Sequence, residues 1–105
     1  MQPPIELDAT SWREVRRVLR AQVPTHDVWA FGSRARYTAK TYSDLDLAII
    51  SEQPMSLAQM ADVQSAFEES DLPIRVDVVD WASCSEAFRA NIAKHKVVVQ
   101  QAALL

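Results

Sequence analysis

Residues 31–50 read FGSRARYTAKTYSDLDLAII, and this stretch decides how the whole chain is interpreted. Gly32, the single glycine among 105 residues, follows an apolar run at residues 28–31 that is typical of a buried strand. Two carboxylates, Asp44 and Asp46, open a second apolar run a dozen residues later. Because glycine takes positive φ without steric cost and lets a backbone approach a ligand closely, we expect a functional site at this junction.

The length and composition predict one globular α/β domain. A chain of 105 residues with 49% hydrophobic and 24% charged residues can bury a single core, so we assign residues 1–105 to one domain with its core at about residues 10–100. The single cysteine excludes an intramolecular disulfide and a cysteine-rich zinc site, and it favours a cytoplasmic location. No apolar run approaches membrane-spanning length. The net charge of −3 makes direct nucleic-acid binding unfavourable except through a local patch.

Hydrophobic periodicity predicts helices that alternate with strands. Ser11 and Ser83, each followed three residues later by glutamate, are the expected N-caps of the first and last helices. The alternation predicts a small β-sheet with helices packed on it, an α/β (α+β) fold. The expected helices cover residues 11–22, 33–39, 56–70 and 83–95, and the expected strands cover residues 28–31, 44–50, 74–80 and 97–99.

Two of the expected helices have distinct faces. The helix at residues 56–70 should bury Leu57, Met60, Ala61 and Phe67. The first helix carries a basic stripe, which is either a solvated face or a docking surface for an acidic partner or RNA. The stripe consists of Arg13, Arg16, Arg17 and Arg20.

The acidic strand predicts a metal site. Asp44 and Asp46 are two residues apart on a strand, so their side chains point to the same face and repel each other unless a cation neutralises them. A solvated strand edge would show the same pair. Oxygen-only ligands suit Mg²⁺ or Mn²⁺, and a third carboxylate would allow two ions to act together. Asp77 and Asp80 are the candidates, and strand alternation favours Asp77, because Val76 and Val78 take the core positions; Asp80 then begins the following turn.

The residues after the first strand predict a phosphate site. Gly32 and Ser33 supply backbone N–H groups and a hydroxyl where a strand ends, which is the arrangement of a phosphate cradle.

These motifs together resemble a known family. The segments 31–36 (FGSRAR), 42–48 (YSDLDLA) and 75–79 (RVDVV) resemble the minimal nucleotidyltransferase (MNT) family of the DNA polymerase β-like nucleotidyltransferase superfamily, over about residues 10–100. The family usually has glycine at the position of Tyr37. Since a tyrosine does not take positive φ cheaply, the loop at residues 37–42 is expected to differ in shape.

The resemblance implies a role for each site residue. Asp44, Asp46 and Asp77 would be the catalytic carboxylates and would hold two Mg²⁺ ions, with Asp77 acting as, or orienting, the base for the incoming hydroxyl. ATP would be the nucleotide substrate. The implied nucleotide-binding residues are Gly32, Ser33, Arg34 and Arg36.

The resemblance also implies a partner and a reaction. Minimal nucleotidyltransferases commonly pair with a helical HEPN-family protein, and many such pairs look like toxin–antitoxin systems in which the antitoxin adenylylates the toxin. The implied function is therefore Mg²⁺-dependent AMP transfer from ATP to a hydroxyl of a partner protein. Two alternatives stay open: an antitoxin that acts by contact alone, and the nucleotide-binding subunit of a split small-molecule, aminoglycoside-like nucleotidyltransferase.

Overall fold

A four-stranded mixed sheet forms the centre of the protein. The computed structural model describes residues 2–103. The strand order is β3-β2-β1-β4; β1 is antiparallel to both β2 and β4, whereas β2 and β3 are parallel. The expected α/β class is confirmed. The elements are α1 (Ala9–Gln22), β1 (Asp27–Phe31), β2 (Leu45–Ile50), α2 (Leu57–Glu68), β3 (Val76–Asp80), the short 3₁₀ helix η1 (Trp81–Ser83), α3 (Glu86–Lys94) and β4 (Val97–Gln100).

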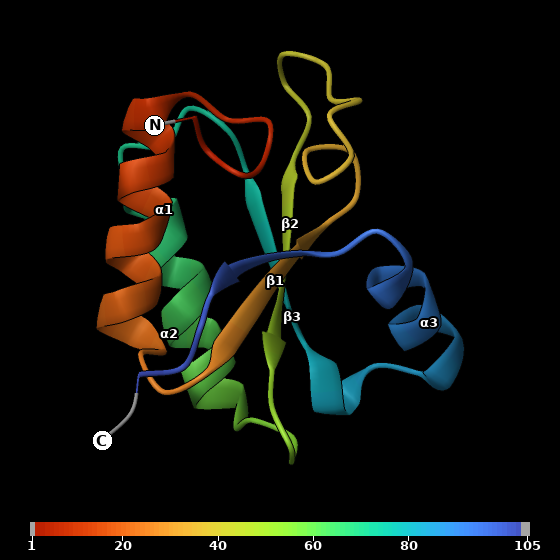
Figure 1. Ribbon diagram of the computed structural model, residues 1–105. Coiled ribbons are helices and arrows are strands. Elements are labelled where there is room, and N and C mark those ends of the chain that lie inside the picture. The colour runs from red at the N-terminus through yellow and green to blue at the C-terminus, as the bar shows by residue number, and fades with distance from the viewer. Residues whose placement is uncertain (1, 104–105) are drawn as a thin grey trace.

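The core lies between one face of the sheet and the helices α1 and α2. Figure 1 shows α1 and α2 on one side of the sheet and α3 on the other. Leu45, Leu47 and Ile49 of β2 are fully buried in this core. The residues that alternate with them must point to the opposite face. The packing of α1 and α2 therefore decides that Asp46 faces away from the core.

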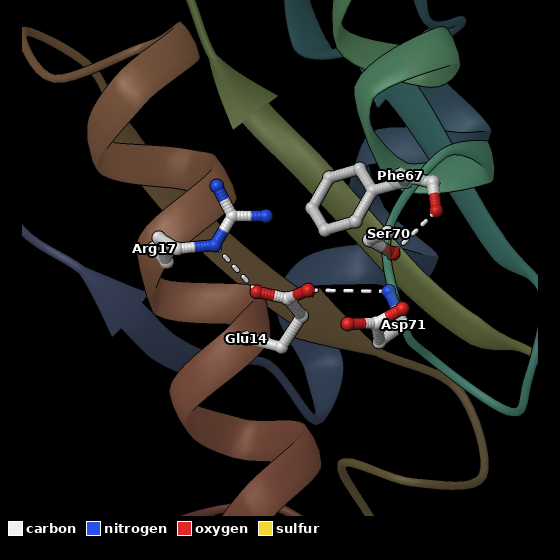
Figure 2. Close-up of polar contacts among 5 residues, drawn as sticks. All are labelled: Glu14, Arg17, Phe67, Ser70 and Asp71. Atoms are coloured by element: carbon white, nitrogen blue, oxygen red, sulfur yellow. Dashed lines mark hydrogen bonds and ion pairs between the residues drawn. The ribbon is translucent and has the colours of Figure 1, made fainter.

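The first helix starts earlier than its sequence predicts. Asp8 is the N-cap, and its carboxylate accepts a hydrogen bond from Ser11 N at 3.1 Å. Figure 2 shows that Glu14 does not reach back to the helix start: its two oxygens accept from Arg17 Nε at 2.5 Å and from the backbone N–H of Asp71 at 3.1 Å. The predicted capping box at Ser11 is therefore wrong, because Asp8 already caps the helix and Glu14 joins α1 to the segment after α2.

The last helix starts later than its sequence predicts. Ser85, not Ser83, is the N-cap of α3 and accepts from Phe88 N at 3.1 Å. The Ser83 hydroxyl instead donates to Asp80 Oδ2 at 2.8 Å. The reason is that residues 81–83 form a 3₁₀ turn at the end of β3, which delays the helix by two residues.

The expected short helix at residues 33–39 is a series of turns. The backbone N–H of Arg36 bonds both Gly32 O and Ser33 O at 3.2 Å, and the N–H of Thr38 bonds Ser33 O at 3.0 Å. Residues 33–37 are turn and residues 38–40 have no regular structure. One turn of mixed hydrogen bonds is too short to propagate a helix.

Tyr37 adopts the backbone conformation expected of glycine. Its φ is +56°, in the left-handed region. The side-chain hydroxyl donates to Pro3 O at 2.8 Å, and this bond links the turn to the N-terminal segment. The fold imposes this conformation on the tyrosine at a cost of about 1–2 kcal/mol, and the expected difference in the shape of the loop stays a prediction.

The buried face of α2 is narrower than expected. Val63 and Phe67 are buried and Met60 is half-buried, at positions i, i+3 and i+7 counted from Met60. Leu57, in the first turn, is 89% exposed, and Ala61 is also exposed, so their predicted burial is wrong. Within residues 2–103, no helix is long and apolar enough to cross a membrane.

Candidate functional site

Three carboxylates lie on the sheet face that α1 and α2 leave uncovered. Asp46 of β2 and Asp77 of β3 are direct partners in the parallel register, and Asp44 immediately precedes β2. Val76 and Val78, on either side of Asp77, pack toward the core. The structure therefore places Asp46 and Asp77 side by side, each on the face that strand alternation predicts.

The electrostatics of this face are those of an unneutralised acidic group. Burial raises the pKa of Asp46, and the negative charges of Asp77 and Asp44 raise it further. Asp77 has a cationic neighbour, because its Oδ1 lies 3.0 Å from Nη2 of Arg75. Both of these side chains are substantially exposed, so the ion pair is screened by solvent. Asp46 carries most of the unrelieved repulsion.

Gly32 is placed against the acidic pair. It has φ +76°, and it follows Phe31, whose Cα is paired with that of Asp46 across β1 and β2. A Cβ at Gly32 would clash with Asp46 Oδ2 and stand 3.4 Å from its Cγ. Left-handed φ therefore favours glycine here, and any Cβ would in addition force the Asp46 carboxylate to move. Ser33 follows directly, half-buried in the turn.

Arg34 serves the fold rather than a ligand. Its side chain is 7% exposed, and its Nε and Nη1 donate to Ser43 O at 2.9 Å and Glu6 O at 2.8 Å. Nη2 donates to Thr41 O at 3.2 Å and lies 3.5 Å from Lys40 O. The predicted contact of Arg34 with a triphosphate does not fit this arrangement, because the guanidinium is committed to carbonyls of the N-terminal segment and of the loop before β2.

Arg36, in contrast, lines a cavity beside the carboxylates. The cavity has a volume of about 270 Å³ and includes Gly32 and Asp46 in its lining. Its far wall comes from Asn91 and Ile92 of α3 and from His95, the C-cap of this helix. Neither Asn91 nor His95 is among the site residues that the sequence predicts. Their four-residue spacing places both on one face of a helix, but nothing in the sequence says that this face turns toward Asp46.

A larger cavity lies elsewhere and lacks the chemistry of a catalytic site. It measures about 610 Å³ and lies between the end of α1 and the segment after β4, with Arg16 and Arg20 in its lining. No carboxylate is among the described residues that line it. The candidate site is therefore the smaller cavity at Asp46.

Comparison with known proteins assigns the chain to a family. Residues 13–103 match the family model described as "Polymerase beta, Nucleotidyltransferase". The chain belongs to this nucleotidyltransferase family. It is 54% identical over 87 residues to a Haemophilus influenzae protein named "Probable protein adenylyltransferase MntA", an alignment that covers 83% of this chain and 76% of the relative. The resemblance to minimal nucleotidyltransferases is thus confirmed.

Solved structures confirm the nucleotidyltransferase fold. A structure described as a toxin–antitoxin with AMP-PNP has a TM-score of 0.73 at 20% identity, over 86% of this chain and 73% of the other. A complex of a tri-AMPylated Shewanella oneidensis HEPN toxin with an MNT antitoxin contains a chain with a TM-score of 0.66 at 18% identity, over 88% of this chain and 71% of that one. At these identities the likeness concerns the fold.

The carboxylates of this nucleotidyltransferase fit divalent cations in their chemistry. All their donors are oxygens, and the pKa of Asp46 is raised first by burial and then by the negative charges of Asp77 and Asp44, a repulsion that a cation would relieve. Within residues 2–103, no three His, Cys, Asp or Glu side chains converge closely enough to enclose a metal ion. Asp77 is instead turned to Arg75. Metal binding at Asp77 would therefore replace an existing ion pair.

Asp80 organises the end of β3 and is not part of the nucleotidyltransferase site. It is 7% exposed; it accepts from the Ser51 hydroxyl, from Met55 N at 2.8 Å and from the Ser83 hydroxyl at 2.8 Å. Burial acts to raise the pKa of Asp80, but these hydrogen bonds outweigh it and the pKa is lowered. Asp80 caps the turn at residues 81–83, and the expectation that it begins this turn is confirmed.

Proposed function

We propose that the protein is a Mg²⁺-dependent nucleotidyltransferase that transfers AMP from ATP to a hydroxyl group of a partner protein. The observation that carries the proposal is the pairing of Asp46 with Asp77, directly against the positive-φ glycine Gly32. A cation would relieve the repulsion between these carboxylates, and a positive-φ glycine lets the backbone approach a phosphate closely. The name of the Haemophilus influenzae relative supports protein adenylylation in particular.

The reaction is a substitution at the α-phosphorus of ATP. The oxygen of the partner's hydroxyl bonds to this phosphorus, the bond to the bridging oxygen breaks, and pyrophosphate leaves with the electron pair. Asp77 accepts, or orients the acceptor of, the hydroxyl proton. Gly32 and Ser33 hold the β- and γ-phosphates, and Arg36 adds positive charge beside them.

Asp44, Asp46 and Asp77 would hold the two divalent ions, with Mn²⁺ as a possible substitute for Mg²⁺. When bound, such ions supply positive charge that activates the attacking oxygen and stabilises the leaving pyrophosphate. The carboxylates fix the ions on the open sheet face, where a partner protein can reach them.

The proposed partner is a HEPN-family toxin, and the protein is proposed to be its antitoxin. The support is the fold shared with the MNT antitoxin that was solved beside an AMPylated HEPN toxin. An adenylylated toxin would stay modified after the antitoxin leaves, which a contact-only antitoxin cannot achieve. The two modes therefore leave different masses on the partner.

Intact mass spectrometry tests the proposal. The complex purified from its native host is incubated with MgATP, and every polypeptide is weighed, with Asp44→Asn as the inactive variant. Asp62→Asn, an exposed aspartate on α2, is the matched control. We expect an AMP-sized increase on the partner with wild type and Asp62→Asn, and none with Asp44→Asn. An unmodified stoichiometric partner that is still neutralised would instead favour contact alone, and modification of an added aminoglycoside would favour the small-molecule alternative.

A further inference from the structure

We infer that Asn91 of α3 and His95, the residue that directly follows this helix, bind the β- and γ-phosphates of the nucleotide, opposite the Asp46 carboxylate. The inference rests on the proposed function and adds a second wall to its site. Both side chains line the cavity of about 270 Å³ that also contains Gly32, Arg36 and Asp46. Asn91 and His95 would then position the pyrophosphate that leaves.

The position of α3 is fixed well enough for this role. Ile92, between the two residues, is fully buried. The ring of Phe88, one turn earlier, packs edge-on against Phe31 at a centroid distance of 5.8 Å. Phe31 is the last residue of β1 and directly precedes Gly32. The helix that carries Asn91 and leads into His95 is therefore packed against the end of β1, where Gly32 and the turn at residues 33–37 begin.

The chemistry of the two walls is complementary to a metal-bound triphosphate. One wall presents the Asp46 carboxylate, which repels phosphate and attracts cations. The α3 side presents the Asn91 amide and the His95 ring, and the turn after β1 adds the Arg36 guanidinium; all three groups donate hydrogen bonds. Phosphate oxygens only accept hydrogen bonds, and they accept strongly because they are charged. Hydrogen-bond donors across a cavity from a carboxylate suit a triphosphate with bound cations, because the donors bind the phosphate oxygens and the carboxylate binds the cations.

The size of the cavity favours phosphates over the nucleoside. About 270 Å³ lies just below the usual range of about 300–1,000 Å³ for complete small-molecule sites, so it fits part of a nucleotide. The α-phosphorus must stay near Asp46 and Asp77, within reach of the partner's hydroxyl. The phosphates that extend from it into the cavity are then the β- and γ-phosphates.

The two side chains are also available for a ligand. Asn91 and His95 are both exposed. Arg89, on the same helix, is already committed, because it donates to Trp81 O and Ala82 O at 2.9 Å each. Removing the Asn91 or His95 side chain should therefore leave the fold intact, which makes a binding experiment interpretable.

The test compares ATP, ADP and AMP by calorimetric titration in Mg²⁺, on the full chain with its co-purified partner. The variants are Asn91→Ala, His95→Ala and His95→Gln, which keeps a donor. Lys94→Ala is the matched control, since Lys94 is exposed on the same helix and does not line the cavity. We expect each alanine variant to bind ATP about tenfold more weakly, the typical effect of one lost hydrogen bond to a charged group. His95→Gln should recover part of the loss, and AMP affinity should not change.

Two results would overturn the inference: unchanged ATP affinity in both alanine variants, or an equal loss for ATP and AMP. Failure of the proposed function gives a different pattern. If the proteins show the expected affinities for ATP, ADP and AMP but the wild type never modifies its partner, protein adenylylation is refuted. The proposed binding of phosphates by Asn91 and His95 is then retained. A wild-type protein that binds no ATP would refute both. Thermal melting of each variant serves as the control for folding.

Discussion

Replacing Asp46 with asparagine should stabilise the free protein while it abolishes transfer. Asp46 lies directly opposite Asp77 on neighbouring strands, and Asp44 adds a third negative charge nearby. Like charges directly opposite each other in a sheet cost about 0.2–1 kcal/mol. Because Asp46 is also partly buried, we place its contribution at the upper end, about 0.5–1 kcal/mol. In a domain of this size the melting temperature should rise by about 2–8 °C.

Asp77→Asn is the matched control for this effect. Asp77 is more exposed, and Arg75 already offsets its charge at 3.0 Å. The substitution removes a repulsion and an exposed ion pair together, so the free energy of unfolding should change by less than about 0.3 kcal/mol. The two carboxylates should therefore differ in their effect on stability, although both are proposed to be needed for transfer.

The pH dependence of the protein's stability is a second test of whether the charge on Asp46 destabilises the folded state. The pKa of Asp46 is raised in the folded state above its ordinary value of 3.8. The folded protein therefore holds this proton more tightly than the unfolded chain, and wild-type stability falls as the pH rises through the raised pKa. The advantage of Asp46→Asn should be absent at the most acid pH and fully present at neutral pH.

The assay of the pH dependence is urea unfolding with EDTA present, from about pH 4 to about pH 8.

A separate thermal-melting experiment without EDTA tests the metal site. Adding Mg²⁺ should raise the melting temperature of wild type but not that of Asp46→Asn, because only the wild type retains the proposed site. A variant that is less stable than wild type at neutral pH, or a stability gap that does not change with pH, would refute the electrostatic account of this site.

Three further predictions concern the residues around the site. Gly32→Ala should cost about 1–2 kcal/mol for its φ, plus an additional amount that disappears in an Asp46→Ala background, as a double-mutant cycle by urea unfolding would show. Arg34→Ala should destabilise the protein by about 2–4 kcal/mol by leaving carbonyls unpaired, whereas Arg36→Ala should change stability by less than about 0.5 kcal/mol and weaken ATP binding; melting and titration of both variants would separate these roles. Asp80→Asn should cost about 2 kcal/mol at neutral pH; since the pKa of Asp80 is lowered, that stability is present above about pH 4 and is lost as the pH falls through the folded pKa, which acid titration of the melting temperature would reveal.

The sequence predicts well which sheet face carries the acidic residues, because alternation in a strand is a strict rule. Once Leu45 and Leu47 are assigned to the core, Asp46 can only point to the other face, and the same reasoning selects Asp77 over Asp80. A one-residue error in either strand would have reversed the result. The pairing of β2 with β3, in contrast, is not contained in any local pattern.

Helix starts were predicted less well because several residues compete to cap them. Ser11 and Ser83 each have a glutamate three residues later, but Asp8 and Ser85 are equally good caps nearby. The choice depends on contacts that are distant in sequence, such as the bond from Asp71 N to Glu14 in Figure 2. No local rule contains that information.

At the site itself, local sequence rules also fail to distinguish the roles of Arg34 and Arg36. Arg34 and Arg36 are two residues apart in one short segment, and by sequence both suit a triphosphate. In the structure, Arg34 binds carbonyls from residues 6 and 40–43, which come together only when the N-terminal segment folds against the loop before β2. Arg36 is left at the cavity. Arg34 thus stabilises the turn that follows Gly32, whereas the Arg36 side chain is available for a ligand in the cavity.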